Sequence, residues 1–417
     1  MARPPRALAR RARRLLGYWR SERRTLRQGL VALALSTLAG FVAGLTIAHL
    51  TEPLSTYPGL LVLIPAAVGM KGTIFGAIGA RLGTASASGV LTLDLRRGGI
   101  LRRNVDVAIY TTFSSALWLA VLTKLASDAF GQPSMSLGDL AVVSVFGGLL
   151  SSVLVLLITV ALSGLSYRLR WDLDAVSTPM VTALGDMTTI PSLFLATALL
   201  GHGAATGALA VAAIGVAAVV GVRGFLARDR RVRRILIEMA ATIAVTPVLD
   251  VAAGGLQEAR LPELTLVPVL LALIPPFVSQ AGALGGIFSS RISSKLQVGV
   301  ITARGRPGAP AIVDAGITVV LSVAVFLAIG AVAWILGAAT GLPGMPSAPA
   351  LIGATLLAGI ALTPITLVVG YYLAVVTFRF GLDPDNQGVP IITSVMDLAG
   401  VACVLFVMTS SGVLGHG

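Results

Sequence analysis

The sequence predicts an all-α polytopic membrane protein with about eleven transmembrane helices. Hydrophobic residues make up 56% of the 417 residues and charged residues only 12%, and the mean hydropathy of +0.91 is far too high for a soluble domain. The apolar residues form segments of about 20 residues, which is the length that crosses a bilayer as a helix. Aromatic residues are sparse (6%) and small residues abundant, which favours closely packed helices over a β-barrel.

The chain begins with a basic arm, residues 1–27, that contains ten arginines. We expect it in the cytoplasm, in contact with anionic lipid headgroups. The predicted spans follow at 28–50, 59–90, 104–126, 138–166, 177–200, 203–222, 234–255, 265–300, 311–337, 348–378 and 388–412.

Arginines alternate between the loops in the way that membrane topology requires. They occur in the loops after the second, fourth, sixth, eighth and tenth spans, whereas the opposite loops contain only Arg260. The positive-inside rule therefore predicts a plasma-membrane protein with a cytoplasmic N-terminus and an extracellular C-terminus. The same distribution explains the net charge of +13 without a nucleic-acid partner.

One Pro/Gly-rich segment occurs twice, at a constant shift of 210 residues. Its copies are Leu61–Gly89 and Leu271–Gly299. The shift superposes Pro65 on Pro275, Gly72 on Gly282 and Gly76 on Gly286. Proline and closely spaced glycines are poor choices for a plain lipid-facing helix, so the duplication indicates a functional element.

A second motif repeats at a shift of 211 residues. Trp171–Met187, with the sequence WDLDAVSTPMVTALGDM, corresponds to Leu382–Leu398, LDPDNQGVPIITSVMDL. We therefore divide the chain into a first five-helix repeat (28–200), a linker of one transmembrane helix and a basic loop (201–233), and a second repeat (234–417). The extra crossing makes the repeats parallel, related by a pseudo-twofold axis along the membrane normal.

Two acids inside the spans, Asp186 and Asp397, are the strongest candidates for an ion site. A carboxylate deep in a bilayer costs about 2.5–3.5 kcal/mol on insertion scales, so it is retained for a reason. Thr182 and Thr393 stand four residues earlier and share the carboxylate face of each helix. A structural alternative is a protonated aspartate, or one paired with an arginine such as Arg81.

The duplicated Pro/Gly segment supplies the other wall of the expected path. Pro65 and the pair Pro275-Pro276 interrupt the helical hydrogen bonds, so some carbonyls could face water, and the glycines allow close helix packing. Both roles are compatible. Lys71 corresponds to Ala281 and would repel cations, so it either points away or pairs with an acid.

Four further acids are predicted near the outer ends of the helices: Glu52, Asp250, Glu258 and Glu263. They could concentrate cations at an outer mouth, although ordinary solvated loop charges are the simpler interpretation. The chain has one cysteine and three histidines and lacks Walker A, HExxH, CxxC and serine-elbow motifs. These features predict that it is not an enzyme.

The motifs resemble the membrane domain of the MgtE family of magnesium transporters. The resemblance rests on the two Pro/Gly segments and on TPMVTALGD and VPIITSVMD about 100 residues after each. With two copies in tandem, the chain is similar to the two-repeat branch of the family, called solute carrier family 41 in animals. The resemblance implies a path for divalent cations between the halves, with Asp186 and Asp397 holding hydrated Mg²⁺ as the transported ion. Since one chain contains both halves, a monomer could suffice.

Two other functions stay open from the residues alone. The first is a proton- or sodium-coupled exchanger or exporter of divalent cations, in which the carboxylates alternate between proton and metal. The second is a membrane protein without transport function. Oxygen ligands favour hard ions such as Mg²⁺, Ca²⁺ or Mn²⁺, and only the resemblance selects Mg²⁺ among them.

Overall fold

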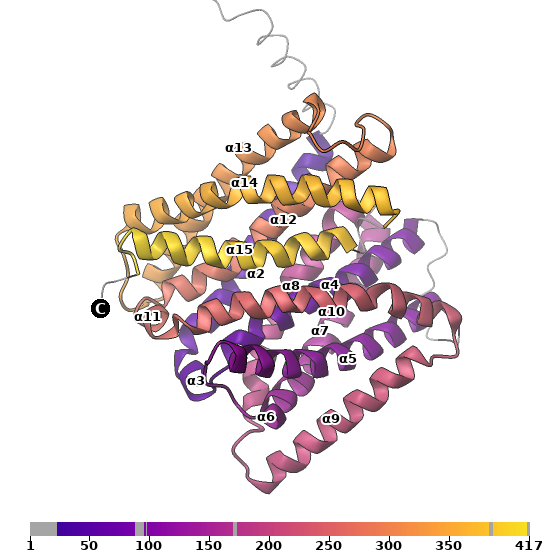
Figure 1. Ribbon diagram of the computed structural model, residues 1–417, viewed down its shortest axis with the longest axis vertical. Helices are drawn as coiled ribbons and strands as arrows, with labels where there is room; N and C mark the ends of the chain where they lie inside the picture. The colour runs from indigo at the N-terminus through magenta and orange to yellow at the C-terminus, as the bar shows by residue number, and fades with distance from the viewer. Residues whose placement is uncertain (1–22, 88–95, 97, 170–172, 383–386, 415–417) are drawn as a thin grey trace, which may run out of the picture.

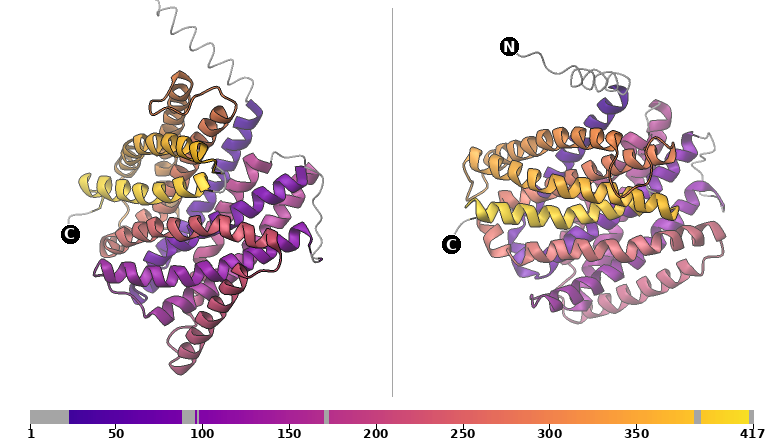
Figure 2. Two further views of the ribbon diagram at one scale, coloured as in Figure 1. Left: turned by 45° about the vertical axis from the view of Figure 1, so that its right-hand side comes forward. Right: turned by 45° about the horizontal axis from the view of Figure 1, so that its top comes forward.

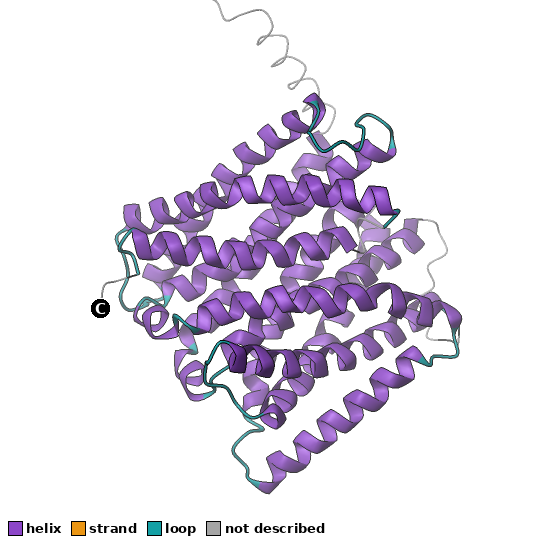
Figure 3. Ribbon diagram, in the orientation of Figure 1, coloured by secondary structure: helices purple, strands orange, loops and turns teal. Residues whose placement is uncertain are grey.

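The described part of the chain consists of helices and the loops that join them (Figure 3), in agreement with the predicted fold class. The computed structural model describes residues 23–87, 96, 98–169, 173–382 and 387–414. Side chains are described from residue 33 onward, except 84, 86, 87, 163–169 and 173–182. Most of the predicted N-terminal arm, residues 1–22, therefore lies outside the described residues.

The first half runs from α2 to α8. Its helices are α2 (Arg23–His49), α3 (Thr51–Thr56), α4 (Leu60–Ala87), α5 (Ile100–Ala129), α6 (Leu137–Val142), the π-helical turn η1 (Val143–Gly147), α7 (Gly148–Leu169) and α8 (Leu173–Thr197). After α9 (Ala204–Phe225), the second half contains α10 (Arg230–Glu258), α11 (Leu261–Leu266), α12 (Val269–Gln297), α13 (Ala309–Ala339), α14 (Ala348–Phe380) and α15 (Val389–Ser410).

Each of the eleven predicted spans coincides with a helix of the structure. Among the described residues, nine helices are long and apolar enough to cross a membrane, and α2 adds the shorter apolar segment Leu33–His49. The remaining helix, α8, has 25 residues, about 37 Å at 1.5 Å per residue. Two features were not predicted: short helices precede α4 and α12, and the π-helical turn η1 interrupts the span 138–166.

The two halves are interlocked through their first helices. Helix α2 packs against α12 of the other half, and α10 packs against α4; in Figures 1 and 2, α10 lies between α15 and α5. A methyl group on Gly44 would lie 2.2 Å from the Ala272 carbonyl oxygen, and one on Gly254 would lie 2.5 Å from the Val62 carbonyl oxygen. Both contacts repeat at a shift of 210 residues, so the two crossings are equivalent.

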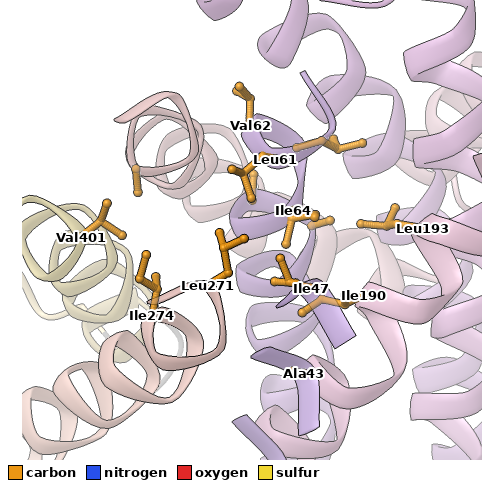
Figure 4. Close-up of a cluster of buried hydrophobic side chains, with 14 of the residues drawn as sticks. Ala43, Ile47, Leu61, Val62, Ile64, Ile190, Leu193, Leu271, Ile274 and Val401 are labelled. Carbon is orange, nitrogen blue, oxygen red and sulfur yellow. The ribbon is translucent and has the colours of Figure 1, made fainter. Parts of the chain in front are cut away.

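Buried apolar side chains fill the space where the crossed helices meet (Figure 4). Ile64 of α4 lies close to Ile47 of α2 and Ile190 of α8, whereas Ile274 of α12 lies beside Val401 of α15. Because Ile64 and Ile274 are equivalent in the repeats, the core reproduces the internal duplication. Its position places the duplicated Pro/Gly helices, α4 and α12, at the centre of the protein.

A second equivalent pair of contacts joins each Pro/Gly helix to the helix that follows. In the first half, the Nε of Arg81 donates to Asn104 Oδ1 at 3.1 Å. In the second half, the Nε of Arg291 lies 3.4 Å from Asp314 Oδ1, and Lys295 contacts the same carboxylate. Arg81 therefore bonds to the side-chain amide of Asn104, whereas its counterpart Arg291 pairs with the carboxylate of Asp314 at the equivalent position.

Helix α9 lies at the edge of the protein, against α5 and α6 (Figure 1). Its glycines approach α5 closely: a methyl group on Gly224 would lie 2.9 Å from Tyr110 Cβ. Its other face is exposed and apolar, including Val211, which is 75% exposed. Helix α9 is therefore peripheral, with much of its apolar surface facing away from the rest of the protein.

Candidate functional site

A cavity of about 260 Å³ lies between the two halves, where α2, α4 and α8 meet α10, α12 and α15. Fourteen of its 24 lining residues occur as equivalent pairs from the two repeats. The seven pairs are Ile47 and Gln257, Ile64 and Ile274, Pro65 and Pro275, Val68 and Val278, Gly69 and Ser279, Asp186 and Asp397, and Ile190 and Val401. The cavity is therefore built by the duplication around one shared centre.

Asp186 and Asp397 are the two acids on this cavity. Asp186 is 4% exposed, and its Oδ1 has no hydrogen-bond partner among the residues that the structure describes. Asp397 is half-buried, and the charges of the two carboxylates interact. Both lie well inside their helices: Asp186 precedes the end of α8 by eleven residues, and Asp397 follows the start of α15 by eight. The sequence-predicted pair thus faces one space.

The threonines of the same motif are placed unequally. Thr393 lines the cavity, and its hydroxyl donates to the Val389 carbonyl oxygen at 2.8 Å. Its hydroxyl oxygen still has lone pairs for a water molecule. The side chain of Thr182 lies outside the described ones, so its predicted equivalence with Thr393 stays a prediction.

The glycines of the duplicated segment have different environments in the two halves. Gly72 and Gly76 line the cavity, whereas Gly282 and Gly286 are not among its lining residues. A methyl group on Gly282 would lie 3.0 Å from Thr393 Cγ2. In the second half, this glycine therefore lets α12 approach α15, and the two predicted roles divide between the copies.

Two backbone carbonyls that lose their helical hydrogen bond because of a proline lie against glycines of the crossing helices α10 and α2. Proline lacks the N–H that would bond to the carbonyl four residues earlier, which is Leu61 for Pro65 and Ala272 for Pro276. Methyl groups on Gly254 and Gly44 would lie 2.9 Å and 2.2 Å from these two oxygens. Glycine backbone covers these two carbonyls, so they are not among those that could face water, and that expectation stays a prediction for the others.

Comparison with known protein families decides the class of protein. The MgtE family model, described as a divalent cation transporter, matches residues 64–196 and 274–407, which is more than half of the chain. The chain belongs to the MgtE family of divalent cation transporters. The two matches begin 210 and end 211 residues apart, as the repeated motifs do. Neither the curated protein sequences nor the solved structures gave a match.

Membership in the MgtE family confirms the resemblance that the repeated motifs carried. It makes the chain a multi-pass membrane protein that transports divalent cations, with two copies of the family domain in one polypeptide. A transporter family also agrees with the prediction that the chain is not an enzyme.

In this MgtE protein, Lys71 points away from the cavity. Its ammonium donates to the Gly148 carbonyl oxygen at 2.6 Å and to the hydroxyl of Ser152, which in turn bonds to Thr112 at 2.9 Å. The group also lies 6.0 Å from the centre of the Phe75 ring. Lys71 is not among the cavity-lining residues, so its charge is directed at α7, behind the wall of the cavity.

The four predicted outer acids do not form one group. Glu52 is exposed, and Glu263 pairs with Arg260 at 2.8 Å, so both are ordinary surface charges. Glu258 accepts the Gly59 backbone N–H at 3.1 Å, next to the N-terminus of α4, where a carboxylate stabilises the helix. The expectation of a solvated charge at a helix end is wrong for Asp250, which is completely buried inside α10.

Several polar lining residues were missed by the sequence reasoning. Ser394 and Gln257 both line the cavity and are 3% and 5% exposed. Ser394 stands three residues before Asp397, one helical turn away, so the aspartate could have identified it. The counterpart of Gln257 in the first repeat is the apolar Ile47. The comparison of the repeats therefore could not identify Gln257 as a polar lining residue.

Proposed function

We propose that this chain transports Mg²⁺ through a path between its two halves, with Asp186 and Asp397 binding the hydrated ion. The observation that carries the proposal is the placement of both acids on one cavity lined by equivalent residues of the two repeats. Two carboxylates supply the two negative charges that balance a divalent cation. Most other lining residues are apolar, and low-polarity surroundings strengthen the attraction between ion and carboxylates.

The dimensions favour an ion that keeps its water. Six water molecules occupy about 180 Å³ at ~30 Å³ each, less than the cavity volume of about 260 Å³. In the described part of the chain, no three His, Cys, Asp or Glu side chains converge closely enough to ligate a bare ion. Mg²⁺ gives up water reluctantly and is often held by one or two carboxylates and several waters, which matches this arrangement.

The division of the chain follows the same reasoning. We infer that residues 28–200 and 234–417 are the two parallel repeats and that residues 201–233 return the chain across the bilayer. Since one polypeptide supplies both carboxylates, a monomer is the transporting unit. The cytoplasmic N-terminus, the plasma-membrane location and the lipid contacts of the basic arm complete the proposal.

Mg²⁺ uptake by proteoliposomes tests the role of the acids. Purified wild type, Asp186→Asn, Asp397→Asn and the double variant are compared using a Mg²⁺-sensitive dye inside the vesicles. We expect each single variant to lose at least about tenfold in flux, because it removes half of the balancing charge. Asp128→Asn is the matched control, since this acid is 55% exposed and pairs with Lys124 on the surface.

One outcome of the uptake assay would refute the assignment of the two aspartates. That outcome is wild-type uptake by the double variant, with intact folding shown by size-exclusion chromatography. Competition by Ca²⁺, Mn²⁺, Co²⁺ and Ni²⁺ measures the selectivity for Mg²⁺. Uptake with and without an imposed pH or Na⁺ gradient distinguishes a channel from a coupled exchanger.

A further inference from the structure

Asp250 is the most unusual acid in the protein. It lies in α10, eight residues before the end of the helix, with an exposed fraction of 0%. Neither of its carboxylate oxygens has a hydrogen-bond partner among the described residues. Burying a charged carboxylate without compensation costs far more than burying any apolar side chain, so in the folded protein either a proton or a cation neutralises it.

The neighbours of Asp250 connect it to the cavity. A methyl group on Gly69 would lie 2.6 Å from Asp250 Oδ2, so the carboxylate rests against the glycine backbone. Ser394 and Asp397 of α15 lie close enough to Asp250 to act on it electrostatically, although the Asp250 carboxylate makes no hydrogen bond among the described residues. Gly69, Ser394 and Asp397 all line the cavity. Asp250 therefore stands directly behind one wall, separated from the cavity by a residue without a side chain.

Nearby basic groups are engaged elsewhere. The Lys71 ammonium, on the helix that carries Gly69, is directed at Gly148 and Ser152 of α7. The Nε of Arg81, further along α4, donates to Asn104. Since these two side chains are directed at other partners, the positive charge that neutralises Asp250 is one that the cavity delivers, a proton or a metal cation.

We propose that Asp250 is a third cation-binding carboxylate and that, with Asp397 and Ser394, it forms a second subsite for a hydrated divalent cation. The proposal rests on the function proposed above and extends it to a residue outside the repeated motif. Asp397 is shared between the two subsites. A cation can then move by exchanging one neighbouring carboxylate for another, and several sites of moderate affinity favour both entry and release.

This subsite exists only in the second half, and the packing explains why. At a shift of 210 residues, the counterpart of Asp250 is Gly40. A methyl group on Gly40 would lie 2.9 Å from the Cα of Pro276, so α12 leaves no room for a side chain there. In α4, the residue equivalent to Pro276 is Ala66. The path therefore departs from twofold symmetry, with its additional negative charge on the side of the second half.

Mn²⁺ binding measured by electron paramagnetic resonance tests the subsite separately from transport. Purified full-length wild type, Asp250→Asn and Glu238→Gln are titrated with Mn²⁺, and the same preparations are assayed for Mg²⁺ uptake. Glu238 is the control because it lies on the same helix and pairs with Arg234 at 2.7 Å. Its side chain is 47% exposed, whereas that of Asp250 is fully buried. We expect Asp250→Asn to lose at least about tenfold in Mn²⁺ affinity and to reduce Mg²⁺ flux, with Glu238→Gln unchanged.

The remaining outcomes are also decisive. Wild-type affinity in Asp250→Asn overturns the subsite, including the case in which only flux falls, because that result indicates a packing role. If Asp250→Asn does not fold, Ser394→Ala takes its place, and an unchanged Mn²⁺ affinity in that variant overturns the proposal. Failure of the function proposed above looks different: Asp186→Asn/Asp397→Asn would then retain wild-type uptake, whatever Asp250→Asn does.

Discussion

Replacing Gly44 or Gly254 by alanine tests the crossed packing of the two halves. The added methyl group would lie 2.2 Å from the Ala272 carbonyl oxygen in the first variant and 2.5 Å from the Val62 carbonyl oxygen in the second. Ordinary contacts of a Cβ begin near 3.4 Å, so each crossing must open by about 1 Å. The obstacle is backbone, which cannot rotate away as a side chain does.

The expected cost follows from this displacement. Overpacking a well-packed interior typically destabilises by about 1–3 kcal/mol, and a backbone clash belongs at the upper end of that range. Alanine also has a higher helix propensity than glycine by ~0.8–1.0 kcal/mol, which offsets part of the loss. We therefore expect each variant to be destabilised by about 1–2 kcal/mol and the two values to be similar, since the contacts are equivalent.

Thermal unfolding of the purified protein in detergent measures the effect. Gly207→Ala is the matched control, because the added methyl group would meet open space rather than a neighbouring helix among the described residues. In this variant only the higher helix propensity of alanine changes the stability. We therefore expect it to be as stable as wild type or more stable by up to ~1 kcal/mol. If Gly44→Ala and Gly254→Ala behave like Gly207→Ala, the interlocked arrangement of α2 with α12 and of α10 with α4 is refuted.

Two further predictions concern charged groups away from the cavity. Lys71→Met should retain Mg²⁺ flux within about twofold per folded molecule and should not lower the unfolding temperature, because it replaces a buried ammonium by an apolar chain of similar size; a loss of flux with intact folding would show that Lys71 acts on the path. The Arg103 guanidinium donates a hydrogen bond to Asp229 at 2.7 Å and lowers the pKa of that carboxyl. The resulting stability is present above the unfolded-state pKa of about 3.9 and is lost as the pH falls through the lower folded-state pKa. Asp229→Asn keeps an acceptor for the Arg231 N–H, so at neutral pH it should unfold at a slightly lower temperature than wild type, by at most ~1 kcal/mol for this partly exposed pair. The difference should shrink as the solution is acidified through the folded-state pKa of Asp229, and a difference of unchanged size in acid would contradict this origin.

Comparison of repeated motifs predicted more about the site than the chemistry of single residues did. The shift of 211 residues pairs Asp186 with Asp397 in the sequence, and the fold brings both acids to one cavity. The same comparison was uninformative for Asp250, whose counterpart is glycine. It therefore left this acid among the outer charges, although the helix continues for eight residues beyond it.

The eleven long spans and the pairing of the repeats could be predicted from the sequence, because hydropathy over about 20 residues and fixed shifts between motifs are properties of the chain alone. The side of each helix that faces the cavity became known only from the packed fold. A helix that is apolar all around carries little directional signal, so the sequence could not orient Lys71 toward α7 or Gly72 and Gly282 toward different surroundings. The crossing of α10 over α4 places Asp250 behind Gly69, and that contact joins two residues far apart in the chain, which no local pattern encodes.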